Sequence, residues 1–173
     1  MESCKHCCEK TVTLLFRREQ LLYDIGNYAF VEGDLLGEEA EHVAHQVKDI
    51  VESGNVDRVT RVLNLAHHEC EELLYPYTKT ALGHGVVLDD TLACPDVYEI
   101  VLTVPNTFAR TTVELLRDSV HEYLVCRVLQ DWLSLTNTPG AAAWDEKLAG
   151  IKSKIQQSLL SRRRYVRRKL KPF

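Results

Sequence analysis

The sequence predicts a mainly α-helical protein: a helical bundle of about five helices with a small β-hairpin insertion and an extended basic C-terminal arm. Three observations predict this fold class. Apolar residues recur at helical spacing over most of the 173 residues. One short stretch, Val97–Pro105, is rich in β-branched residues and alternates between two faces, as a strand does. The last thirteen residues contain seven Arg or Lys and no Asp or Glu.

Three helices are expected in the first half of the chain. The first covers residues 9 to about 31, and its apolar face consists of Leu14, Leu15, Leu21, Leu22, Ile25 and Tyr28. The second covers residues 38–53 and begins with acidic residues, which the helix dipole favours at that end. The third runs from about residue 56 to residue 75, where Pro76 stops it.

In the middle of the chain the spacing of apolar residues changes from that of a helix to that of a strand. The stretches "GVVLDD" (residues 85–90) and "VYEIVLTVP" (residues 97–105) are short and β-branched, and a turn region that contains proline separates them. We expect them to form the two strands of a hairpin that lies against the helices, because an isolated hairpin is only marginally stable in water.

The dominant helix is expected at about residues 108–136, followed by a last helix at about 142–160. The apolar side chains of the dominant helix cover a wide part of its circumference, which is typical of a helix that is central to a core or shared with a partner. The residues that we take as candidates for an oligomer interface are Leu115, Val125, Leu129, Trp132 and Leu133. Together the elements predict one helical domain over residues 1–160, with the hairpin at about 85–105, and an arm over residues 161–173.

The charge of the chain is distributed unevenly. The formal net charge is −4, yet the ten basic residues from Lys147 onward have no acidic residue among them. The preceding 146 residues hold the other 11 basic residues and all 25 acidic ones, a balance of −14. An acidic body with a basic end indicates an electrostatic partner for that end, either nucleic acid or an acidic protein surface.

The sequence contains no feature of a membrane or secreted protein. No apolar run approaches the roughly 20 residues that cross a bilayer. The first residues, "MESCKHCCEK", lack the apolar core of a signal peptide, so we expect a protein that is made and kept in a cytoplasm, with its six cysteines reduced.

Two metal sites are conceivable, and neither is favoured. Cys4 and Cys7 could join His67 and Cys70 in a tetrahedral zinc site, although frayed terminal thiols and surface histidines explain these residues more simply. Glu39-x-x-His42 has the spacing used by di-iron helical bundles, and Asp118-x-x-His121 is a weaker echo of it. Only Glu19 and Asp24 are available as further carboxylates on the first helix, so the set is short of a complete site. We therefore expect neither a metal nor another cofactor.

The sequence also contains no motif of an enzyme. It has no nucleophile elbow, no glycine-rich phosphate loop and no His-Glu-x-x-His pattern, and we expect a protein without catalytic residues.

The arm carries the strongest candidate for a binding function. Its basic side chains can each neutralise a phosphate or a carboxylate, and its aromatic side chains can stack or anchor. The candidate residues for binding a partner or nucleic acid are Arg162, Arg163, Arg164, Tyr165, Arg167, Arg168, Lys169, Lys171 and Phe173.

Four stretches carry a resemblance to a known group of proteins. They are "LLYDIGNYAFVEGD", "SGNVDRVTRVLNLAHHECEELLYPYTKT", "TTVELLRDSVHEYLVCRVLQDWLS" and "RRRYVRRKLKPF". Taken together, they resemble small structural proteins from the late genes of tailed phages and prophages of Bacteroides-type bacteria. The layout is most similar to that of head–tail connector (adaptor) proteins.

This resemblance implies a virion protein of the head–tail neck, assembled in the host bacterial cytoplasm. It would form a ring of about a dozen copies between the portal protein and the tail or a second neck protein, with DNA passing through the lumen. The basic arm would contact the portal, a neighbouring copy or the DNA. Two other functions stay open: a tail-completion or terminator protein, and a nucleic-acid-binding accessory protein that uses the arm.

Overall fold

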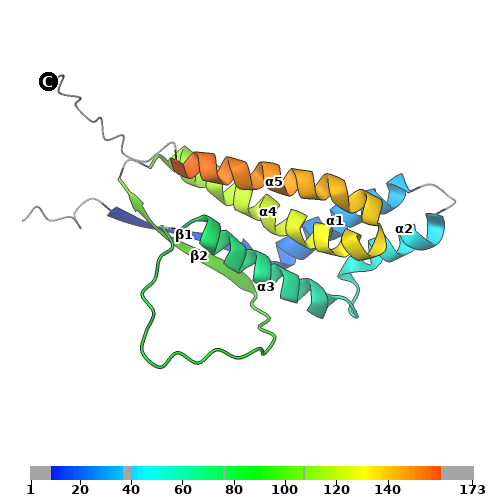
Figure 1. The fold of residues 1–173 in the computed structure, drawn as a ribbon, viewed down its shortest axis with the longest axis horizontal. Coiled ribbons are helices and arrows are strands. Elements are labelled where there is room, and N and C mark those ends of the chain that lie inside the picture. The colour runs from blue at the N-terminus through cyan, green and yellow to red at the C-terminus, as the bar shows by residue number, and fades with distance from the viewer. Residues whose placement is uncertain (1–8, 37–39, 76, 107, 161–173) are drawn as a thin grey trace, which may run out of the picture.

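The computed structural model describes residues 9–36, 40–75, 77–106 and 108–160, and the fold is mainly helical (Figure 1). The elements are β1 (Glu9–Arg17), α1 (Arg18–Leu35), α2 (Glu41–Lys48), the short 3-10 helix η3 (Asp49–Val51), α3 (Val56–Leu73), β2 (Val97–Pro105), α4 (Arg110–Thr136) and α5 (Thr138–Leu160). Five α-helices and one small antiparallel sheet match the fold class that the sequence predicts.

Helix α4 lies at the centre of the bundle. It packs against α5, α3 and α1 and also contacts α2. Its buried side chains include Leu116, Val120, Leu124 and Val128, which follow one another at intervals of four residues. Asn137 alone joins α4 to α5, so the two helices run in opposite directions, and α3 runs parallel to α5 (Figure 1).

The sheet corrects one prediction from the sequence. Strand β2 is where alternation predicts it, but its partner is β1, with Leu14 opposite Ile100 and Phe16 opposite Tyr98. These four side chains are buried on one face of the sheet. Residues 9–17 are therefore a strand and not the first part of a helix.

The expected first strand of the hairpin, residues 85–90, has no regular structure. Val87 and Leu88 are both almost 90% exposed, at 89% and 88%. The stretch is β-branched, but in the described part of the chain the sheet consists of β1 and β2, and residues 85–90 do not pair with either strand. It belongs to the long irregular segment between α3 and β2, drawn as the wide arc in Figure 1.

The sheet is attached to the helices through side chains on α3 and α4. The Tyr98 hydroxyl donates a hydrogen bond to Asn64 Oδ1 at 2.8 Å. The Phe16 ring lies 6.4 Å from the His121 ring of α4, measured between centroids. A two-stranded sheet gains its stability from such packing on helices.

The close approach of α1 to α2 depends on Gly33. A Cβ at this position would lie 3.0 Å from the Ala44 carbonyl oxygen and 2.7 Å from two carbons of the Lys48 side chain. Gly33→Ala should therefore lower the free energy of unfolding by about 1–3 kcal/mol, because overpacking outweighs the helix propensity of alanine. Gly150→Ala in α5 is the matched control, since a Cβ there meets nothing within 4 Å, and it should add about 0.5–1 kcal/mol. Urea unfolding of both variants measures the two changes in the free energy of unfolding. Equal changes would contradict the close approach of α1 to α2 at Gly33.

Candidate functional site: an acidic groove between helices α3 and α5

A groove runs between the C-terminal halves of the two parallel helices α3 and α5. Its apolar part includes Leu65, Leu73, Leu159 and Leu160, and its polar part includes Glu69, Glu72, Lys152 and Gln156. Leu65 and Leu160 are about half exposed, at 50% and 55%. The groove thus presents apolar surface to solvent beside two carboxylates.

The two carboxylates of the groove differ in their surroundings. Glu69 accepts a hydrogen bond of 2.5 Å from the Tyr123 hydroxyl, and Arg127 lies 3.5 Å from the same oxygen. Burial of the phenol, and then its hydrogen bond to Glu69, raises the pKa of Tyr123. Glu72 is exposed and has no ion-pair partner among the described residues. Glu72 is therefore the carboxylate that a partner can reach.

The ends of both helices strengthen the negative potential of the groove. The last turns of α3 and α5 contain no basic residue, and the last turn of α3 contains Glu71 and Glu72. The C-terminal end of a helix carries a partial negative charge that favours cations. Both helices finish at the same end of the molecule (Figure 1). A cationic ligand fits this end of the groove.

The basic arm begins where the groove ends. Leu160 is the last residue of α5 and also lines the groove. The nine arm residues predicted to bind a partner, from Arg162 to Phe173, lie outside the described residues.

The structure places most of the interface candidates inside the protomer. Leu115 is 55% exposed, whereas Val125, Leu129 and Leu133 are fully buried. Trp132 is also buried, and its indole N–H donates to the Val47 carbonyl oxygen at 3.2 Å. The wide apolar face of α4 is explained by α1, α3 and α5 packing around it in the same chain. Of the five candidates, only Leu115 lies on the surface.

Only two of the residues considered for a zinc site, His67 and Cys70, lie among the described residues. Cys70 is a core residue, and burial raises the pKa of its thiol far above the usual range. Cys4 and Cys7 lie outside the described residues. His67 instead meets His68 and Glu71, with the ligand atoms of all three within 4.8 Å of one another.

The residues considered for a di-iron site do not gather into one cluster among the described residues. Asp118 is exposed and pairs with Arg117, and His42 and Glu19 are exposed. His121 and Asp24 do meet, with 2.8 Å between Nε2 and Oδ2, and join α4 to α1. Glu39 lies outside the described residues. The geometry of the His121–Asp24 pair is that of a polar contact between α4 and α1.

A polar cluster that the sequence did not predict joins α1, α4 and α5. Lys147 Nζ lies 2.5 Å from Glu122 Oε1, and the Tyr28 hydroxyl donates to the same oxygen at 3.3 Å. The ammonium group also lies 4.7 Å from the centroids of the Tyr28 and Trp144 rings. Burial alone would raise the pKa of Glu122, but Lys147 outweighs it and lowers that pKa.

No protein-family model, curated protein or solved structure matches this chain. None of the described helices has the length and apolar character needed to cross a membrane.

Proposed function

We propose that the protein is a structural protein of the head–tail neck of a tailed phage or prophage, a ring-forming adaptor between portal and tail. The observation that carries this proposal is the groove between α3 and α5, whose negative end adjoins a strongly basic segment of the same chain. The resemblance of the sequence to connector proteins supplies the biological setting, and the mainly helical fold is compatible with it.

The groove and the arm are complementary in two respects. The seven basic residues of the arm would pair with the carboxylates and the negative helix ends of the groove. Its apolar and aromatic residues would pack on the apolar surface of the groove; they are Tyr165, Val166, Leu170 and Phe173. In the proposed ring, the arm of one copy occupies the groove of the next. Such a contact joins two different surfaces, and contacts of this kind close into rings when the rotation between copies allows it.

Glu72→Lys should abolish ring formation, because it places a cation where the basic arm docks. Glu146→Lys is the matched control: it makes the same charge change at an exposed site on α5, away from the groove residues. Native mass spectrometry of the full chain over a range of concentrations measures the subunit number. We expect a closed ring of about a dozen copies for the wild type and for Glu146→Lys, and monomers for Glu72→Lys.

Three outcomes would contradict this proposal. A wild-type chain that stays monomeric at every concentration would argue against a self-assembling ring. Rings that survive Glu72→Lys unchanged would place the contact elsewhere. A closed hexamer would favour the terminator alternative over the connector.

The basic arm also supports a second candidate function, that of a nucleic-acid-binding accessory protein. With up to seven phosphate contacts, the logarithm of the affinity for duplex DNA would fall with the logarithm of salt concentration with a slope of up to about −6. Fluorescence anisotropy with a labelled duplex measures this slope. A steep slope together with a monomeric protein would favour the accessory function, whereas weak binding at low salt would exclude it.

A further inference from the structure

We propose that His67, His68 and Glu71 on α3 form a binding site for a divalent transition-metal ion of the zinc type. This site shares His68 with the lining of the groove between α3 and α5, but it does not depend on the phage assignment.

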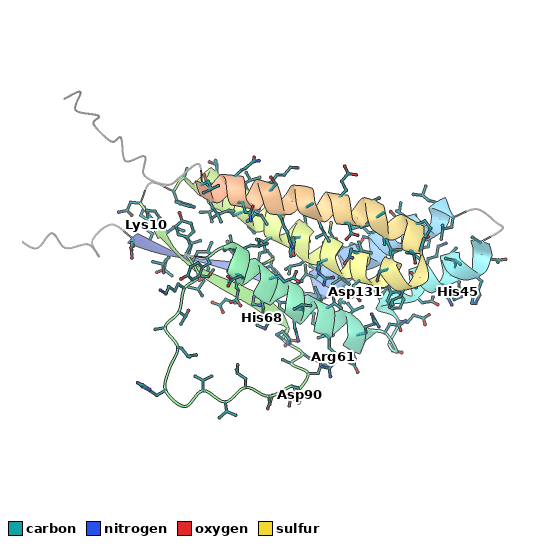
Figure 2. The ribbon with its side chains drawn as sticks, in the orientation of Figure 1. Lys10, His45, Arg61, His68, Asp90 and Asp131 are labelled. Carbon is teal, nitrogen blue, oxygen red and sulfur yellow. The ribbon has the colours of Figure 1, made fainter. Side chains whose placement is uncertain are left out.

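The three side chains already converge. Glu71 Oε2 lies 3.1 Å from His68 Nδ1 and 3.9 Å from His67 Nδ1. Zinc holds nitrogen and oxygen ligands at about 2.0–2.2 Å, so two ligands of one ion lie no more than about 4.4 Å apart. Small side-chain rotations therefore bring all three atoms within reach of one ion. His68, labelled in Figure 2, belongs to the exposed side of α3.

The ring of His67 is held in the tautomer that a metal requires. Its Nε2 lies 3.0 Å from the carbonyl oxygen of Glu99 in β2. A carbonyl only accepts hydrogen bonds, so Nε2 carries the hydrogen and the Nδ1 lone pair of the neutral ring faces Glu71. Histidines that bind metals almost always donate their other N–H in this way. The Tyr98 ring, 5.4 Å away between centroids, packs against the same imidazole, and His67 is only 13% exposed.

The surroundings of the site favour a cation. The hollow beside His67 and His68 is also lined by Asp89, Asp90 and Glu99, against one cationic side chain, Arg61. Asp89 and Asp90 belong to the irregular segment between α3 and β2, so a bound ion would attract this segment toward α3.

The donor set selects the class of ion. Two imidazole nitrogens and one carboxylate suit zinc, copper or nickel, whereas calcium and magnesium require oxygen ligands. Three protein ligands leave a fourth position for water or for a carboxylate of the neighbouring segment.

The test is a titration of the full chain, stripped of metal with a chelator and kept reduced, with Co²⁺ followed by its visible spectrum and with Zn²⁺ in competition. We expect one ion bound through nitrogen and oxygen, without the sulfur-to-cobalt charge-transfer band that cysteine ligands would give. Glu71→Gln and His67→Gln should each weaken the affinity by about 10- to 100-fold.

His45→Gln is the matched control, because His45 also faces a carboxylate one helical turn away, in Asp49, but has no third ligand among the described residues. The affinity of His45→Gln for the metal ion should equal that of the wild type. Glu71 lies on the helix surface, so Glu71→Gln should retain the wild-type circular dichroism even where His67→Gln disturbs packing. The absence of binding, or binding that is unchanged in Glu71→Gln, would overturn the proposal, and so would a spectrum dominated by sulfur ligation.

Discussion

Leu129→Ala should lower the free energy of unfolding by about 2–5 kcal/mol, one of the two largest effects that we expect for a single substitution in this chain. Leu129 is fully buried in α4, the helix around which α1, α3 and α5 pack. Alanine would remove three carbons from a close-packed interior and leave a cavity. Urea unfolding followed by circular dichroism measures the change.

Leu115→Ala is the control from the same helix. Leu115 is 55% exposed, so its truncation should change the free energy of unfolding by no more than about 0.5 kcal/mol. If Leu129→Ala instead left stability unchanged and altered only the oligomeric state, Leu129 would lie in an interface between copies, as the sequence predicts, and the core described for α4 would be wrong.

The difference between these two leucines shows what the sequence could establish about α4. Its helical period and approximate ends follow from the spacing of apolar residues. The width of its apolar face does not reveal whether neighbouring helices of the same chain or of another copy cover it, because burial has the same amino-acid signature in both cases. Only the positions of α1, α3 and α5 in the structure show that helices of the same chain cover the apolar face of α4.

The first strand could not be assigned from its local pattern. The stretch around Leu14 and Phe16 places apolar residues at positions that fit both a strand and the start of a helix. Its β-branched neighbours, Val12 and two threonines, favour a strand, but the partner lies some eighty residues away in β2. Residues 85–90 also contain two β-branched residues, Val86 and Val87, yet they pair with none of the described strands. Pairing between distant segments therefore decided both assignments.

The candidate sites depend on distant contacts in the same way. The basic arm is visible in the sequence, whereas the groove exists because α3 and α5 run parallel and end together. Glu71 lies one turn from His67, a spacing that could have been noticed. The orientation of the His67 ring depends on the Glu99 carbonyl in β2, 32 residues further along the chain.

Lys147→Met should lower the free energy of unfolding by about 1–2 kcal/mol at pH 7. The substitution removes the cation beside Glu122 and the ammonium contacts with the Tyr28 and Trp144 rings, while methionine keeps much of the apolar stem. The magnitude is modest because both charged side chains are about one-third exposed, at 39% and 33%, and solvent screens the pair. Lys154→Met is the control, since Lys154 is exposed on the same helix, and it should be nearly neutral.

The pH dependence identifies the pair as the cause of this loss. Burial disfavours the charged form of Glu122, but Lys147 lowers its pKa in the folded protein below the value of about 4.3 in the unfolded chain. Its contribution to stability is therefore present above that unfolded value and is lost as the pH falls through the folded pKa. Burial likewise opposes the charge of Lys147, and Glu122 outweighs it and raises the pKa, so this contribution is present below about 10.4 and is lost as the pH rises through the folded pKa.

Unfolding curves of wild type and Lys147→Met should thus differ most between about pH 5 and pH 9 and converge toward acid pH. The double variant Glu122→Gln/Lys147→Met completes a thermodynamic cycle. Its loss of unfolding free energy should be smaller than the sum of the losses in the two single variants, because the glutamine leaves no unpaired carboxylate between the helices. Additive effects, or a difference that stays constant down to pH 2, would show that Lys147 acts only through the aromatic rings and that the ion pair contributes nothing.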